Sequence, residues 1–439
     1  MHRYSRWARI FAAVTIVGLA TWVLAKDPTP TDLGKENVEK FKKIRPGELL
    51  PLIKGTRQVQ DGDKKNIELA AQVLVWRVSW PLTPNNNPKV MDEVRKQFNE
   101  EINALLDKES RANNKAYRKM FAKYLIGCFK KVFELPFDEN RIGCVNAAIL
   151  LPSLARLNDD EDVGDFLAEL IKDPKKHDSI KLYALKGLVA FFPAYEWTVI
   201  APKDNAGNVV SDAQKKRYIE RIKVVTDFLQ RKWESSKADD DAVSFLRRQA
   251  IKTLGQAQVP AVEVKNQKVD GSVVGSLLKI LDPMNGMTPP PSLQEKIEAA
   301  IGICQIKLIP NSLYLPELGV YRVGTVVVDF ADAYQKDKRV GGTIRSIPWK
   351  VQGERLTQAL KLQVKNLDNS EPARKKAQVL LDTVDPDLKA IKAHLDNLPD
   401  DPKALGKVVN GMKPPTRAVF TGIKPEIDKP KNDKPKNDK

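Results

Sequence analysis

A short amphipathic segment, residues 239–256, constrains the fold of this 439-residue chain more than any other stretch. Its apolar side chains recur at steps of three and four residues, which places them on one narrow face of a helix. These residues are Val243, Leu246, Ala250 and Leu254. Asp241 suits the start of this helix, and Gly255 suits its end. Because an isolated helix of this length is only marginally stable in water, a neighbouring element must cover the apolar face.

The same spacing returns elsewhere in the chain, so the segment is one copy of a repeat. The copies begin at Gly143, Ile180, Leu246 and Leu293, at intervals of 37, 66 and 47 residues. These intervals suit a two-helix unit of about 40–47 residues, with an insertion before the third copy. Apolar periodicity also predicts helices over residues 63–80, 89–108, 114–134, 139–157, 212–235, 315–336, 348–367, 371–384 and 386–397. The chain is therefore expected to be a stack of helical hairpins.

Residues 246–255, Leu-Arg-Arg-Gln-Ala-Ile-Lys-Thr-Leu-Gly, resemble the second helix of the HEAT repeat. In that family an aliphatic–Arg pair opens the helix, an Ala follows, and Leu-Gly closes it. The resemblance covers roughly residues 139–305 and implies an all-α, armadillo-like α-solenoid, which we expect over residues 63–400. It also implies that the arginine at the position of Arg247 pairs with acids of the adjacent repeat. An irregular all-α bundle is the alternative fold.

Residues 1–25 resemble a secretory signal peptide. A basic segment ends at Arg9, an apolar run extends from Ile10 to Leu24, and Ala25 precedes Lys26. This run is shorter than the ~20 residues that span a bilayer comfortably, and an uncleaved anchor is the alternative. In either case the chain is expected outside the cytoplasm, in the periplasm, the cell envelope or the extracellular space.

Three further segments are expected to lie outside the helical core. Residues 26–62 are charged and interrupted by prolines, which predicts a linker or adaptor with one short helix over residues 32–44. Residues 196–211 predict a small β-hairpin that projects from the array. Residues 401–439 are rich in Lys and Pro and predict a disordered tail, whose charge could tether the chain to an anionic matrix.

The three cysteines leave one structural question open. Cys128 and Cys144 lie eight residues either side of Pro136, the expected turn between two helices. Residues equidistant from such a turn lie at similar heights, so the two could form a disulfide in an oxidising compartment. Two small buried thiols are the alternative. Cys304 would be unpaired in either arrangement. The sequence contains no CxxC pair, so a zinc ribbon is not expected.

The net charge of the chain and the absence of known catalytic motifs limit the classes of function that we expect. The net charge is +17, or +14 without residues 1–25, and such a surface attracts polyanions. No GxSxG, HExxH, GxGxxG or EF-hand order occurs. The acidic runs at residues 159–162 and 239–241 suit helix starts and need no ion. We therefore expect this chain to have no enzymatic activity, no cofactor and no bound metal.

The expected function is that of an exported, non-catalytic scaffold that binds a protein or peptide along the helical array. The candidate contact residues are Arg247, Arg248, Lys252, Lys215, Lys216 and Arg217. The alternative is an electrostatic binder of an anionic envelope polymer or a membrane surface, acting through the basic cluster at residues 215–217 and the tail. A merely solvated surface would explain the same cluster. No specific nucleic acid is predicted, and membrane contact is expected only through an uncleaved N-terminal segment.

Overall fold

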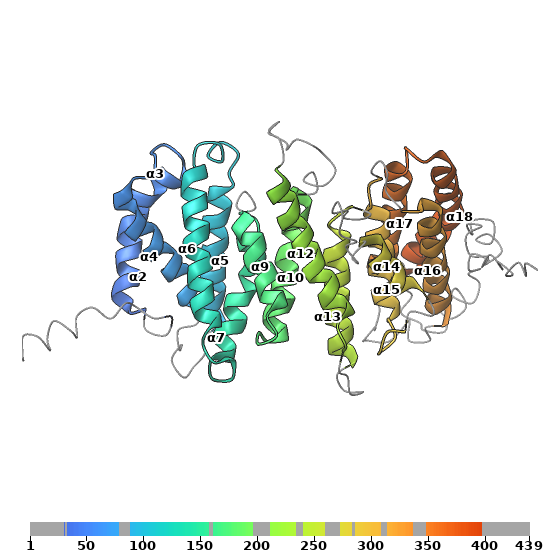
Figure 1. The fold of residues 1–439 in the computed structure, drawn as a ribbon, viewed down its shortest axis with the longest axis horizontal. Coiled ribbons are helices and arrows are strands. Elements are labelled where there is room, and N and C mark those ends of the chain that lie inside the picture. The colour runs from blue at the N-terminus through green and yellow to red at the C-terminus, as the bar shows by residue number, and fades with distance from the viewer. Residues whose placement is uncertain are drawn as a thin grey trace, which may run out of the picture. The chain divides into compact units, whose positions relative to one another are not determined.

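Every regular element in the part of the chain that the computed structural model describes is a helix, so the fold is all-α as predicted (Figure 1). The description covers residues 30, 33–78, 88–157, 161–195, 211–233, 240–259, 273–282, 286–308, 314–336 and 348–396. The predicted signal segment, the tail and all but the last residue of the predicted β-hairpin lie outside these residues. The chain divides into two compact units, Met1–Asp159 and Asp160–Lys439, which are described in turn.

The first unit packs helices around a core centred on α4 and α6, which lie against each other. Its α-helices are α2 (Lys35–Ile44), α3 (Leu50–Ile53), α4 (Lys64–Trp76), α5 (Pro88–Leu105), α6 (Lys115–Phe133), α7 (Phe137–Ile149) and α8 (Leu151–Leu154). A π-helical turn, η1 (Arg45–Leu49), joins α2 to α3, and a 3₁₀ turn, η2 (Asp61–Asp63), precedes α4. Side-chain hydrogen bonds tie distant segments together, for example from the Trp76 indole to the Cys128 carbonyl at 3.2 Å.

The linker predicted over residues 26–62 is wrong where the structure describes it, because residues 33–53 belong to the core of the first unit. Phe41, Leu49 and Leu52 are buried, and α2 packs against α4. The prediction was wrong because it treated the prolines as interruptions of helical structure. Pro46 and Pro51 are the second residues of η1 and α3, yet the helical path runs without a gap from Lys35 through both of them to Ile53. The π-helical turn at Pro46 replaces the regular α-helical hydrogen bonding there.

The disulfide considered for Cys128 and Cys144 is not formed. Both side chains are buried as thiols, as is Cys304 in the second unit. The Cys144 sulfur lies 3.6 Å from the Val132 carbonyl oxygen in a weak hydrogen bond. Burial raises the pKa of Cys128 to about 12, so this thiol is a poor nucleophile at neutral pH. The cysteines therefore fill core space, which was the alternative reading of the sequence.

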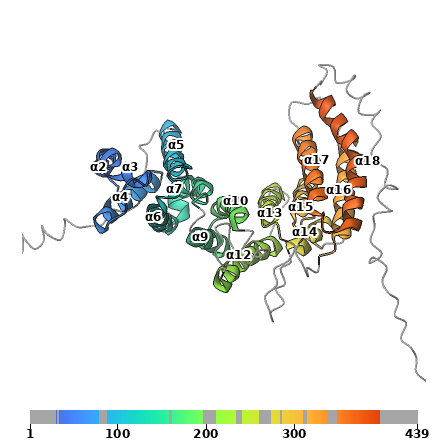
Figure 2. The ribbon, with the colours of Figure 1, turned by 90° about the horizontal axis from the view of Figure 1, so that it is seen from above.

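The second unit arranges its helices in two layers. They are α9 (Glu161–Lys172), α10 (Asp178–Tyr195), α12 (Asp212–Gln230), α13 (Asp240–Gly255), α14 (Val273–Leu281), α15 (Leu293–Gln305), α16 (Pro316–Lys336), α17 (Trp349–Asn366) and α18 (Glu371–Asp396). In the first layer α9, α12, α14, α16 and α18 each contact the next, and in the second layer α10, α13, α15 and α17 do the same (Figure 2). Contacts between the layers join α9 to α10, α12 to α13, α14 to α15 and α17 to α18.

The predicted boundary between two helices at the end of the second unit is wrong. The two helices predicted over residues 371–384 and 386–397 form one continuous helix, α18. Pro386, the first residue of the second predicted segment, removes a backbone donor. Here the helix continues through it.

Two glycines bring α13 and α15 into close contact. A Cβ atom added at Gly255 would lie 2.8 Å from the Gly302 Cα atom, and one added at Gly302 would lie 3.1 Å from the Gly255 Cα atom. Gly255 is the last residue of α13 and does not have a positive φ. Its role is thus to permit the close approach of two helices, beyond the helix termination that the sequence indicated.

We expect Gly255→Ala to lower the unfolding free energy of the second unit by about 1–3 kcal/mol, because the new methyl group meets backbone atoms that cannot move independently. Gly353→Ala is the matched control, because its Cβ atom would meet only ring atoms of Phe330 at 3.9 Å. The control should be neutral, or stabilising by up to about 1 kcal/mol, as for other helical Gly→Ala changes. Calorimetric unfolding of both variants measures the difference, and equal transition temperatures would contradict the proposed packing.

Candidate functional site

The six predicted contact residues lie on two helices of the second unit, and the structure gives them different roles. Lys215, Lys216 and Arg217 lie in the first two turns of α12. Arg247, Arg248 and Lys252 lie on α13. Arg217 and Arg247 form ion pairs with other described residues, whereas the other four do not.

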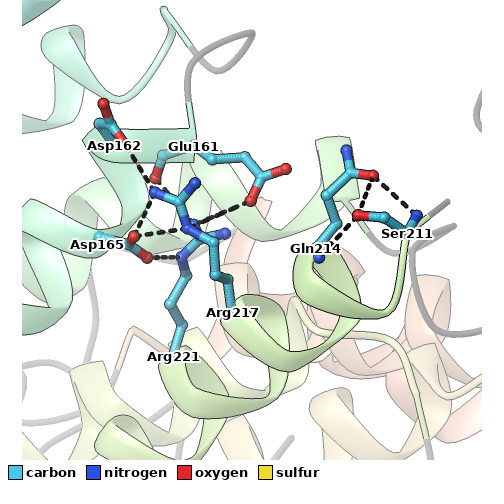
Figure 3. A network of polar contacts seen from close by, with 7 residues as sticks. All are labelled: Glu161, Asp162, Asp165, Ser211, Gln214, Arg217 and Arg221. Atoms are coloured by element: carbon cyan, nitrogen blue, oxygen red, sulfur yellow. Dashed lines mark hydrogen bonds and ion pairs between the residues drawn. The ribbon is translucent and has the colours of Figure 1, made fainter.

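Arg217 belongs to a network of charges that joins α12 to α9 (Figure 3). Its guanidinium lies 2.7 Å from Asp165 Oδ2 and 2.6 Å from Asp162 Oδ1. The neighbouring Arg221, only 1% exposed, donates from Nε to Asp165 Oδ1 at 2.7 Å and from Nη2 to the Glu161 carbonyl at 2.8 Å. Although burial lowers the pKa of Arg217, its hydrogen bonds to Asp165 and Asp162 outweigh that effect and raise it.

Arg217 therefore has a structural role, because carboxylates of α9 already neutralise its charge within the fold. The sequence hid this pairing, since the acids precede Arg217 by more than 50 residues. Lys215 is half-buried and Lys216 is exposed, and neither forms an ion pair with any residue that the structure describes. These two lysines alone keep the surface role expected of the cluster.

Arg247 also has a structural role and does not lie at the surface. Its side chain and that of Glu295 are both 0% exposed, and the two form a bidentate pair, with Nε–Oε1 at 2.6 Å and Nη2–Oε2 at 3.1 Å. Arg247 Nη1 also donates to the Pro289 carbonyl at 2.6 Å, and the Ser244 hydroxyl donates to Glu295 at 2.9 Å. The pair therefore fixes α15 against α13, and Arg247 cannot contact a partner.

A different set of residues, some half-buried and some exposed, forms a face on α10 and α13, which we call the α10–α13 face. It consists of Tyr183, Lys186, Phe245, Arg248 and Lys252. The steps of three and four residues within each helix place these side chains on one side of it. The Lys186 ammonium lies 4.6 Å from the centre of the Tyr183 ring, and the Arg248 guanidinium lies 5.1 Å from the centre of the Phe245 ring. Arg248 also donates to the Gln294 amide oxygen of α15.

Lys186 and Lys252 bring like charges together from the two helices. Burial lowers the pKa of Lys186, and the nearby charge of Lys252 lowers it further. Neither lysine forms an ion pair within the described part of the chain. Phe245 is 43% exposed, which is unusual for so large an apolar side chain. The face thus combines uncompensated positive charge with exposed aromatic surface.

Sequence reasoning found Arg248 and Lys252 of this face but missed Tyr183, Lys186 and Phe245. The missed signal was the i, i+3 pair of an aromatic residue and a cation, which occurs in α10 as Tyr183 and Lys186 and in α13 as Phe245 and Arg248. The apolar repeat drew attention to the buried side of each helix. The opposite side carries this second pattern.

Neither a metal site nor a membrane-spanning helix is found among the described residues. No group of three or more His, Cys, Asp or Glu side chains there could hold a metal ion. None of the described helices is both long and apolar enough to cross a bilayer. No protein-family model, no curated protein and no solved structure matches this chain. Functional inference therefore depends on the geometry of the chain itself.

Replacing Arg247 with methionine should destabilise the second unit by about 3–5 kcal/mol, because Glu295 would stay buried without its counter-charge. The double variant R247M/E295M should recover part of this loss, since it leaves no buried charge. Arg374→Met, which disrupts an exposed pair with Glu371, should have little effect. Urea unfolding of the three variants compares these costs. If R247M unfolds at the same urea concentration as R374M, the structural role of the buried pair is wrong.

Proposed function

We propose that this chain is an exported, non-catalytic interaction scaffold, in which a HEAT-like α-solenoid presents the α10–α13 face to a protein or peptide partner. The observation that carries this proposal is the combination of the exposed Phe245 ring, the half-buried Tyr183 ring and two lysines without ion-pair partners among the described residues. Aromatic side chains with arginine or lysine beside them are typical of the centres of protein interfaces. The partner should bring carboxylates toward Lys186 and Lys252 and an apolar side chain toward Phe245.

The packing of the second unit supports a HEAT-like architecture. Successive helices of each layer contact one another, as the units of a solenoid do. Arg247 of α13 pairs with Glu295 of α15, which is the kind of pairing that the HEAT resemblance implies. Arg355 of α17 likewise pairs with Glu298 of α15 through two contacts of 2.6 Å. In an array of this kind the outer side of the second layer is free to bind.

Export rests on the pattern of residues 1–25, and a binding role outside the cytoplasm follows from it. A basic segment, an apolar run and a small residue at the end are the parts of a signal peptide. An uncleaved form would keep the scaffold at the membrane, whereas a cleaved form would release it into the envelope or the medium. The size of the mature chain after secretion distinguishes these two outcomes.

A second candidate, the electrostatic binding of an anionic polymer or membrane surface, is favoured by Lys215 and Lys216. These lysines form no ion pair within the described residues, and the tail adds further positive charge. The loss of Arg217 to the α9–α12 network reduces the charge available to this mode. Binding through exposed lysines should weaken steeply as the salt concentration rises, while binding through Phe245 should not.

Site-specific crosslinking tests the proposed face in the native envelope. With a photoreactive amino acid at Phe245, we expect a discrete crosslinked product, and the same group at the exposed Val379 of α18 should yield none. The double variant K186E/K252E should reduce the Phe245 product at least tenfold, because it reverses the charge that attracts the partner. The variant K215E/K216E should leave the product unchanged.

Two results would reject this proposal. A Phe245 product that survives K186E/K252E would show that the cations of the face do not contribute to binding. Loss of the product in K215E/K216E instead would favour the electrostatic mode. Circular dichroism of each variant should match the wild-type spectrum, so that a loss of crosslinking reports on binding and not on folding.

A further inference from the structure

A pocket of ≈ 370 Å³ lies in the second unit where the C-terminal ends of α12 and α14 meet the loop before α15. It is lined by Leu229, Gln230, Arg231, Lys232, Trp233, Ser276, Lys279, Ile280, Gly286, Met287 and Thr288. Its volume falls within the ~300–1,000 Å³ that is usual for small-molecule sites. None of its residues belongs to the α10–α13 face, so this site is distinct from the one proposed above.

One wall of the pocket is aromatic and held in place. The Trp233 indole donates to the Leu229 carbonyl at 3.2 Å, and its ring meets Phe228 edge-on at 5.4 Å between centres. The Arg231 guanidinium lies 4.0 Å from the centre of the Trp233 ring and 4.2 Å from that of Phe228. Leu229 and Ile280 are buried beside this wall. The wall thus offers a rigid apolar surface to a flat ligand.

The charges around the pocket are predominantly positive. Arg231 is neutralised by Asp178, whose two carboxylate oxygens lie 3.0 and 3.3 Å from it. Lys232 and Lys279 are exposed and form no ion pair with any described residue. The C-terminal ends of α12 and α14 each contribute only about half a negative charge. No Asp or Glu side chain lines the pocket, so the two lysines give its lining a net positive charge.

A polar contact links the two helices beside the pocket. The Gln230 amide donates to the Ser276 hydroxyl at 3.4 Å, which links the end of α12 to α14. Gly286, whose φ is +67°, turns the loop at the pocket edge, and a Cβ atom there would meet nothing within 4 Å. The pocket therefore has fixed walls, an open edge and an uncompensated charge at its rim.

From this arrangement we propose that the pocket binds a small organic anion. A flat, apolar body of one or two rings lies against Trp233 and Ile280, and its carboxylate or phosphate head is held by Lys232 and Lys279. Apolar walls with a few convergent polar groups are the usual design of such sites. The two lysines supply point charges that suit either type of head group.

Isothermal titration of the full mature chain tests this proposal with three probes of similar shape. 2-Naphthoate and 2-naphthyl phosphate carry the two candidate head groups, and 2-naphthol carries neither. We expect saturable binding of one equivalent of at least one anion, and at least tenfold weaker binding of 2-naphthol. The stronger of the two anions identifies the head group that the lysines prefer.

Variants locate the binding within the molecule. K232Q/K279Q should weaken the preferred anion at least tenfold, whereas K361Q/K365Q, a pair of exposed lysines on α17, should leave it unchanged. In protein labelled with fluorotryptophan, the ¹⁹F signal assigned through W233F should shift on titration while the other tryptophan signals stay in place. This readout reports on the pocket even if the lysine variants alter stability.

Three results would overturn the proposal. One is the absence of binding by both anions at millimolar concentration, and another is equal binding of 2-naphthol. The third is affinity that survives K232Q/K279Q together with an unmoved Trp233 signal. None of these results bears on the α10–α13 face, whose crosslinking test uses different residues.

Discussion

The buried pair of Arg247 and Glu295 is the interaction on which the geometry of the second unit depends. Two charges withdrawn from water are costly unless their hydrogen-bonding groups are satisfied, and here carbonyl, hydroxyl and amide groups complete the pair. Glu295 also caps α15 by accepting from the Ser292 backbone, so one carboxylate sets both the start of a helix and its position against α13. With Gly255 and Gly302 in contact along the same helices, the pair defines how one hairpin lies on the next. We interpret it as a device of specificity, because a shifted register would leave a buried charge alone.

The presence of a carboxylate partner on a neighbouring helix distinguishes the cations that stabilise the fold from those that can bind another molecule. Arg217, Arg221 and Arg247 face neighbouring helices and find carboxylates there. Arg248 is one residue further along α13 than Arg247, yet this step of about 100° turns it from the interior to the surface. Its partners are then a glutamine and an aromatic ring rather than an acid. Basic composition therefore overstates the charge available to a partner, and only the residues outside the helix contacts should be counted.

Much of the architecture could be predicted from the sequence, and the failures have identifiable causes. The helical patterns between residues 114 and 134 and between residues 348 and 367 correspond closely to α6 and α17, because apolar periodicity is set by the burial of one face. Pro46 and Pro51 were interpreted as interruptions, although the helical path continues through both, with a π-helical turn at Pro46. Arg217 was expected at the surface because its carboxylate partners lie more than 50 residues away in the sequence. For Arg247 the HEAT resemblance implied an acidic partner in the adjacent repeat, although the residue was also considered as a surface contact. The α10–α13 face was predicted in part, since Arg248 and Lys252 were identified on α13 but the complementary residues of α10 were not.

Both proposed binding regions follow from the way narrow apolar stripes organise a helical stack. A stripe of this width covers about one third of a helix surface, so charged and aromatic residues on the opposite side stay uncovered however tightly the helices pack. On α10 and α13, adjacent in one layer, these residues combine into a broad face that suits a macromolecular partner. At the ends of α12 and α14 in the other layer, the helices stop and their last residues surround a hollow that suits only a small ligand. The two regions thus differ in scale because one uses the sides of helices and the other uses their ends.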